Sequence, residues 1–170
     1  MNSIVNNSTY IPIDISSFNT YYSFVNLNNV VMENLKILLA DDNDTFRTGL
    51  AEFVNNQYGF KVIGEANDGA QALNLIDSLK PDVVMLDVSM PKLDGISAAR
   101  LIKKESPNVY VIMVTIHDEK VFKELATVIP VDGYISKSSI SEELPKFLSS
   151  LKMKIDSAKP RMGKSKIREN

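Results

Sequence analysis

The sequence predicts an α/β fold, a doubly wound parallel sheet of five strands with five helices. Short apolar runs alternate with segments that have the period of an amphipathic helix, and this pair of patterns occurs five times between residues 35 and 155. The run VYVIMVT at 109–115 is apolar almost throughout, as in a strand with both faces buried. Strands and helices that alternate in this way form parallel sheets with right-handed crossovers.

The first two strand–helix pairs follow from local pattern. LKILLA at 35–40 is a short apolar run, and Asp44 is expected to cap the helix that comes after it. FKVIGEA at 60–66 alternates like a strand. The segment DGAQALNLIDSLK at 68–80 has apolar residues at helical spacing along one face, which predicts the second helix.

The other three pairs are assigned in the same way. Gly95 opens a helical period, and Pro130 ends another because proline cannot continue a helix. The expected strands are 82–87, 109–115 and 133–136, and the expected helices are 95–105, 118–129 and 141–155.

Length and composition exclude several classes of protein. The chain has 170 residues, of which 44% are hydrophobic, enough for one globular domain with a full core. It has no cysteine and only one histidine, His117, which excludes disulfides, thiolate metal sites and paired-histidine chemistry. No window of 18 continuous apolar residues occurs, so we expect no membrane span and a cytoplasmic location.

The two ends differ from the middle in composition. Residues 1–34 are expected to be a disordered or weakly ordered extension, since 1–31 contain no Lys or Arg and the domain begins directly after Met32. Residues 35–152 are expected to be the folded domain, and 153–170 a basic tail. A basic tail can bind nucleic acid or an acidic partner, but a solvated terminus is the favoured interpretation because no apolar period continues through it.

Polar residues come at the ends of four of the five expected strands. These are Asp41 and Asp42, Asp87, Thr115 and Lys137. Chemistry in an open parallel sheet lies at the carboxyl ends of the strands, so these side chains are expected to meet. Crowded carboxylates without His or Cys suit a hard cation such as Mg²⁺, and an ammonium with a hydroxyl suits the oxygens of a phosphoryl group. A carboxylate can itself attack phosphorus, and Asp87, on the middle strand, is the candidate nucleophile.

These residues resemble the receiver domains of two-component response regulators, which have the CheY-like fold. The resemblance covers residues 35 to about 152. Its motifs are DD at 41–42, LDVSMPKLDG at 86–95, VTIHDE at 114–119 and DGYISKS at 132–138.

The resemblance implies that Asp87 accepts phosphate from a partner histidine kinase in the presence of Mg²⁺. It implies that Asp42 and Asp87 bind the ion directly, Asp41 through water, and Ser89 through its backbone carbonyl. No enzymatic turnover is expected beyond slow self-dephosphorylation.

The resemblance also implies a conformational switch. Thr115 and Lys137 would bind the phosphoryl oxygens, and Tyr134 would turn inward when Thr115 moves. The surface formed by residues 118–154 would then change, and an output protein or a second copy of the chain would dock there.

Some positions vary from the common pattern of the family. Ser138 stands where many receivers have a proline, and Ile116 replaces a small residue after the hydroxyl. Ser89, Ile116 and His117 are expected at the mouth of the pocket, where side chains orient or exclude water. Packing explains Ile116 equally well, and an inert role is the favoured interpretation for His117.

Two alternatives remain open. The motifs most resemble those of receivers with a LuxR-type helix-turn-helix output domain, on the evidence of TIHDE and GYISKSSISEEL. The 18 residues after Lys152 are too few to form such a DNA-binding domain. The chain is therefore expected to be a stand-alone receiver or a truncated DNA-binding transcriptional regulator. An aspartate-nucleophile, Mg²⁺-dependent phosphohydrolase is the second alternative, but such enzymes usually place a general acid two residues after the nucleophile, where this chain has Ser89.

Overall fold

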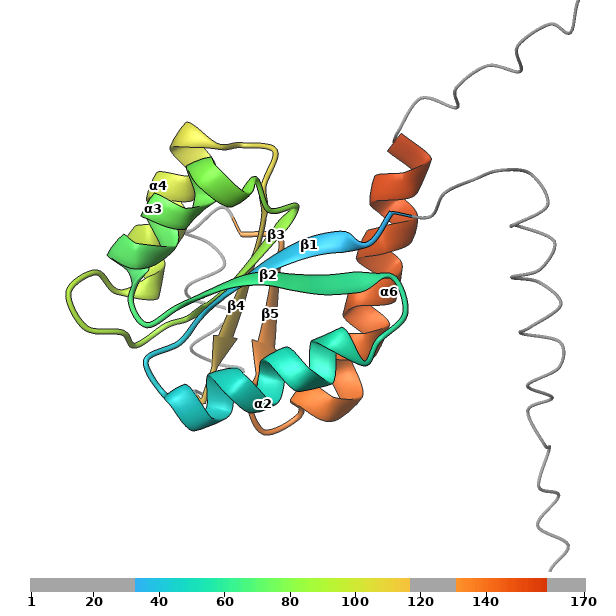
Figure 1. The fold of residues 1–170 in the computed structure, drawn as a ribbon, viewed down its shortest axis with the longest axis horizontal. Helices are drawn as coiled ribbons and strands as arrows, with labels where there is room; N and C mark the ends of the chain where they lie inside the picture. The colour runs from blue at the N-terminus through green and yellow to red at the C-terminus, as the bar shows by residue number, and fades with distance from the viewer. Residues whose placement is uncertain (1–32, 117–130, 159–170) are drawn as a thin grey trace, which may run out of the picture. The chain divides into compact units, whose positions relative to one another are not determined.

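The computed structural model describes residues 33–116 and 131–158. The chain divides into two units, Met1–Glu33 and Asn34–Asn170, and the described elements belong to the second. In chain order they are β1 (Leu35–Ala40), α2 (Asp44–Asn55), β2 (Phe60–Ala66), α3 (Gly69–Leu79), β3 (Val83–Asp87), α4 (Gly95–Glu105), β4 (Tyr110–Thr115), β5 (Gly133–Ser136) and α6 (Ile140–Ala158). Figure 1 shows their arrangement.

The five strands form one parallel sheet in the order β2-β1-β3-β4-β5. This confirms the predicted fold class. The predicted helix at 118–129 lies outside the described residues, and the other elements have bounds within three residues of those expected. None of the helices in the described part of the chain has the length and apolar character to cross a membrane.

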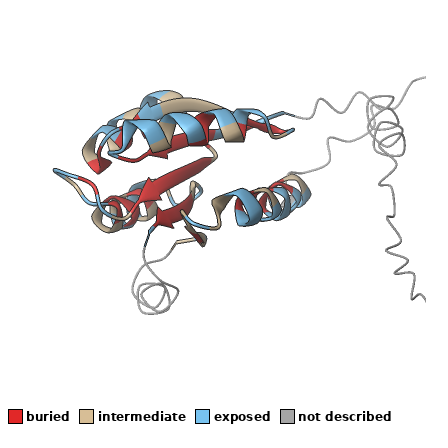
Figure 2. Ribbon diagram, turned by 90° about the horizontal axis from the view of Figure 1, so that it is seen from below, coloured by how far each residue is buried: buried red, intermediate tan, exposed pale blue. Residues whose placement is uncertain are grey.

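The sheet is covered on both faces, as Figures 1 and 2 show. Alternate residues of a strand point to opposite faces, so Ile37 packs into one cluster and Leu38 into the other. The first cluster includes the apolar faces of α2 and α6, and the second includes those of α3 and α4. β4 is apolar along its length because both of its faces are buried: Ile112 belongs to the first cluster and Met113 to the second.

The start of α2 differs from the prediction. Asn43, not Asp44, is the N-cap: its backbone is extended, and its side chain accepts a hydrogen bond from the Phe46 N–H at 3.0 Å. Asp44 is the first helical residue, where a negative charge is favourable, and its carboxylate lies 2.6 Å from the guanidinium of Arg47. Two adjacent polar residues both suit a cap, so local pattern did not distinguish them.

The last turns of α6 contain a buried lysine. Lys152, the last residue of the expected folded domain, is only 9% exposed and pairs with Asp156 at 3.3 Å. Its aliphatic stem lies against Gly59, where an added Cβ would be 2.9 Å from the lysine Cε. Long basic side chains can bury their stems in this way while the charged end stays near the surface. The helix continues beyond it, and Ile155 is still part of the core.

A glycine brings the start of α4 against the end of β3. A Cβ at Gly95 would lie 1.9 Å from the backbone carbonyl oxygen of Asp87, a distance that no side chain tolerates. The Gly95 N–H also donates to the carbonyl of Val88 at 3.0 Å. The loop between these elements is therefore closed tightly on the strand end that carries Asp87.

We predict that Gly95→Ala destabilises the protein by about 1–3 kcal/mol, because the new methyl group forces the Asp87 backbone to move. Gly49→Ala is the matched control: it lies in α2 with nothing within 4 Å of an added Cβ, and it should stabilise by about 0.5–1 kcal/mol. Urea unfolding of the two variants measures both effects. Changes of the same sign in both would contradict the close approach at Gly95.

Candidate functional site

Three aspartates meet at the carboxyl ends of β1 and β3. Oxygen atoms of Asp41, Asp42 and Asp87 all lie within 4.8 Å of one another. The two strands are neighbours in the sheet, so the residues that follow or end them lie at the same edge. Asp41 and Asp87 are buried, and Asp42 is exposed. We call these three residues the acidic group.

Lys137 lies between the two buried members of the acidic group. Its Nζ is 2.7 Å from Asp41 Oδ2 and 3.0 Å from Asp87 Oδ1. Lys137 follows β5, which is separated from β3 by β4, so its side chain reaches past the end of one strand. Its backbone N–H donates to the Thr115 carbonyl at 2.8 Å, which fixes the start of the side chain at this edge.

The electrostatics of the site are set by burial and by these ion pairs. Burial raises the pKa of Asp87, and the charge of Asp41 adds to that effect, whereas the hydrogen bond and charge of Lys137 oppose it. Burial of Lys137 favours the neutral amine, but the hydrogen bonds to Asp41 and Asp87 outweigh it and raise the pKa of the ammonium. The lysine thus stays charged, and it supplies the positive charge that two neighbouring carboxylates require.

The hydroxyl residue predicted for the site lies at the same edge. Thr115 ends β4, is 2% exposed and pairs in register with Ser136. Val114 pairs with Asp87, so Thr115 lies one position further along the strand direction than the aspartate. The structure therefore brings together Asp41, Asp42, Asp87, Thr115 and Lys137, as the sequence predicted.

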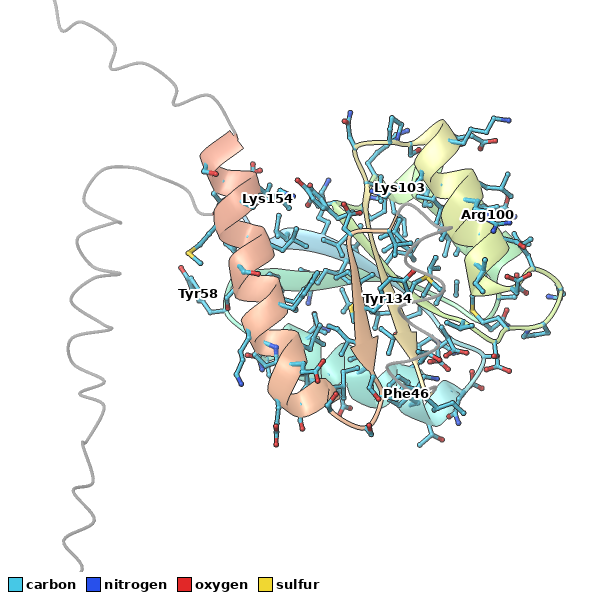
Figure 3. The ribbon with its side chains drawn as sticks, turned by 180° about the vertical axis from the view of Figure 1, so that it is seen from behind. Phe46, Tyr58, Arg100, Lys103, Tyr134 and Lys154 are labelled. Atoms are coloured by element: carbon cyan, nitrogen blue, oxygen red, sulfur yellow. The ribbon has the colours of Figure 1, made fainter. Side chains whose placement is uncertain are left out.

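The residues predicted for the switch and for the mouth of the pocket differ in how far they are buried. Tyr134 is half-buried on β5, packs against the cluster formed with α3 and α4 (Figure 3), and has a pKa raised by burial. Ser89 is exposed, and its N–H donates to Asp87 Oδ2 at 3.0 Å. Ile116 is 76% exposed, so it projects from the site rather than into the core. His117 lies outside the described residues.

Arg47 was missed by the sequence analysis. Its guanidinium donates to the Asp41 carbonyl at 2.6 Å and pairs with Asp44 at 2.6 Å and Glu65 at 3.1 Å. It thereby joins the loop after β1 to α2 and to the end of β2. The three-residue spacing between Asp44 and Arg47 was a signal for their helical pair, but the contact with the Asp41 backbone has no local signature.

The sequence around Phe46 indicates only an apolar position of the helix. The centre of its ring lies 4.4 Å from the Nζ of Lys137. Its apolar spacing in α2 predicts packing on the core, which the structure has, and gives no sign of a contact with a lysine 91 positions later.

An ion pair between a buried aspartate and an exposed lysine fixes the loop that follows β3. Asp68, 2% exposed, caps α3 and pairs with Lys92 at 2.6 Å. Lys92 has a positive φ of 61°, and the next residue, Leu93, accepts a hydrogen bond from the Gly69 N–H at 3.0 Å. Both contacts tie the loop to the start of α3. The loop begins immediately after Asp87, so this anchoring limits where the residues beside Asp87 lie.

The site suits the chemistry of a hard cation and a phosphoryl group. Oxygen ligands without sulfur or nitrogen are the type that Mg²⁺ and Ca²⁺ prefer. The residues present therefore fit the ion that the sequence implied. Lys137 places a cation next to Asp87, and Thr115, one position beyond the register partner of Asp87, carries a hydroxyl at the same edge. An ammonium and a hydroxyl together suit phosphate oxygens.

Sequence comparisons agree with this geometry. Residues 37–149 match the response regulator receiver domain family. The response regulator GacA of Pseudomonas aeruginosa is 36% identical over 110 residues, covering 65% of this chain and 51% of GacA. The response regulator protein VraR of Staphylococcus saprophyticus is 33% identical over 112 residues, covering 65% of this chain and 53% of VraR. The chain thus spans about half the length of these curated relatives.

Solved structures with a similar fold include two from response regulators. A two-component response regulator of the LuxR family from Aurantimonas sp. has a TM-score of 0.67 and 28% identity, covering 72% of this chain and 87% of that one. The signal receiver domain of the putative response regulator NarL from Mycobacterium tuberculosis has a TM-score of 0.65 and 30% identity, covering 71% of this chain and 98% of that one.

We predict that the Asp68–Lys92 pair makes stability depend on pH. The hydrogen bond from Lys92, followed by that from the Gln71 N–H, lowers the pKa of Asp68. A lowered folded-state pKa stabilises the protein above the ordinary carboxyl pKa of about 3.9, and that stabilisation is lost as the pH falls through the folded value. Asp68→Asn keeps a capping side chain but removes the charge, so the stability advantage of the wild type should shrink as the pH falls from 6 towards 3.

Urea unfolding over this pH range measures the difference. Asp77→Asn, at an exposed position of the same helix 3.8 Å from Lys80, is the control, and its difference from the wild type should vary far less. A difference for Asp68→Asn that stays constant with pH would exclude the ion pair as its source.

Proposed function

This chain belongs to the response regulator receiver domain family, and from that membership we propose that it is a phosphoacceptor in two-component signalling, with Asp87 as the residue that takes the phosphoryl group from a histidine kinase. The observation that carries the proposal is the position of Asp87, which is buried at a strand end beside two further carboxylates and 3.0 Å from an ammonium. A carboxylate in this setting has both a place for the incoming phosphoryl group and a cation for its charge.

The transfer forms one bond and breaks one. A carboxylate oxygen of Asp87 attacks phosphorus, and the P–N bond of the phosphohistidine breaks. The bonding pair leaves with the ring nitrogen, and the kinase histidine departs as neutral imidazole if its other ring nitrogen carries a proton. The product is an acyl phosphate on Asp87. Lys137 holds Asp87 Oδ1, and the Ser89 N–H holds Oδ2, so the carboxylate is oriented before transfer.

The acidic group is the proposed Mg²⁺ site. Asp42 and Asp87 would bind the ion directly, Asp41 through water, and Ser89 through its backbone carbonyl. When bound, the ion would offset the negative charge of the carboxylates and of the phosphoryl oxygens. The exposure of Asp42 supports this assignment, because the site opens to solvent on that side.

Lys137 and Thr115 are proposed to bind the phosphoryl oxygens. The group brings a charge of about −1.5 to −2 to the strand ends, which would draw the Thr115 hydroxyl towards it. Tyr134 lies two residues before Ser136, the register partner of Thr115, so a shift at the end of β4 reaches it through paired strands. This coupling would change the surface of residues 118–154, part of which lies outside the described residues.

The chain is proposed to be cytoplasmic. Its proposed partners are a histidine kinase and, through that surface, an output protein or a second copy of the chain. The curated relatives are about twice as long as the matched region. Co-purification with the phosphorylated chain, and not with the unphosphorylated chain, identifies such a partner.

We predict that Asp87→Asn abolishes uptake of phosphate from phosphoramidate or acetyl phosphate in Mg²⁺, because the amide is not a nucleophile towards phosphorus. Intact-mass spectrometry measures the added phosphoryl group. Asp77→Asn, near the end of α3, is the control and should label like the wild type, and labelling of the wild type should stop when the metal is chelated. Labelling that persists in Asp87→Asn would overturn the assignment of the acceptor.

A further inference from the structure

An aromatic ring lies against the ammonium of Lys137, in addition to the two carboxylates. The ring of Phe46, in the first turn of α2, has its centre 4.4 Å from Nζ. Asp41 and Asp87 lie 2.7 Å and 3.0 Å from the same atom. Figure 3 shows Phe46 at the edge of the sheet where β4 and β5 end.

The three contacts together define where the ammonium lies. A lysine has three N–H donors on a flexible four-carbon stem, and holding it in one place costs side-chain entropy. Two carboxylates pair with it, and an aromatic face attracts it without offering a competing hydrogen-bond acceptor. Only 14% of the lysine side chain remains exposed, so few water molecules reach it.

The ring is held in place independently of Lys137. The Phe46 N–H is bound by the Asn43 cap at 3.0 Å, and its side chain packs against the core cluster between α2 and α6. The next residue, Arg47, fastens the same turn to the Asp41 carbonyl. The position of the ring is therefore set by the fold, and the lysine adapts to it.

We propose that Phe46 is a positioning residue for Lys137: its ring holds the ammonium beside Asp87, so that the cation is in place when the phosphoryl group arrives. This inference rests on the proposed function of Asp87. In this role Phe46 acts only through the lysine. A loss of the ring lets the ammonium adopt other positions, which lowers the fraction of molecules ready for transfer.

Two substitutions separate the aromatic contact from simple packing. Phe46→Tyr keeps the ring, and Phe46→Leu keeps an apolar side chain without it. Phe53→Leu is the matched control: Phe53 lies seven residues later on the same face of α2 and packs on the same core cluster. The two leucine variants should lose comparable stability.

The first measurement is the rate of phosphorylation by phosphoramidate at saturating Mg²⁺, followed by intact-mass spectrometry. Phe46→Leu should react about 3- to 10-fold more slowly than the wild type, the size expected for loss of one partly desolvated cation–π contact. Phe46→Tyr should restore the rate to within about twofold, since tyrosine offers a similar ring face. A wild-type rate in Phe46→Leu, or an equal slowing in Phe53→Leu, would overturn the proposal.

The second measurement does not depend on phosphate. In ¹H–¹³C NMR spectra, the ε-methylene protons of Lys137 should be shifted upfield by the ring current of Phe46, and the shift should disappear in Phe46→Leu but remain in Phe53→Leu. An unshifted signal in the wild type would contradict the geometry. If the wild type takes up no phosphate at all, the proposed function fails while this measurement still decides whether Phe46 positions Lys137.

Discussion

The placement of one ammonium between two buried carboxylates is the interaction on which the rest of the site depends. Asp41 and Asp87 end up side by side because β1 and β3 are parallel neighbours, and two negative groups at a sheet edge are unfavourable without a nearby positive charge. Lys137 supplies that charge from a third strand, with Nζ within 3.0 Å of both. The strand order, and with it the whole doubly wound topology, is what makes this contact geometrically available.

The backbone segments that carry Asp41 and Asp87 are each fastened by contacts with residues outside the site. Arg47 binds the Asp41 carbonyl, and the Asp68–Lys92 pair holds the loop after Asp87. Gly95 lets α4 begin against the Asp87 backbone itself. These contacts come from the starts of three different helices, so the edge of the sheet that carries the site is supported by α2, α3 and α4. Preorganisation of this kind reduces the cost of orienting groups during a reaction.

The candidate site was largely predictable because its residues follow strands, and strand ends in a parallel sheet meet at one edge. Asp41, Asp42, Asp87, Thr115 and Lys137 were all found in this way and lie together. The supporting residues were not found, since an apolar residue such as Phe46 or a helical arginine such as Arg47 has the same local pattern whether or not it contacts the site. The N-cap of α2 was misplaced for a related reason: Asn43 and Asp44 have equal capping chemistry, and only the backbone angles distinguish them.

The sequence by itself determined the succession of strands and helices along the chain, the parallel sheet and the identity of the acidic group, because these follow from periodicity and from residues that are adjacent or regularly spaced in the chain. The tertiary structure decided which side chain pairs with which charge, where Lys152 lies and what covers Lys137. Those outcomes depend on distances between residues far apart in the chain, such as Phe46 and Lys137. Such distances are fixed by strand order, register and helix packing, which no local pattern encodes.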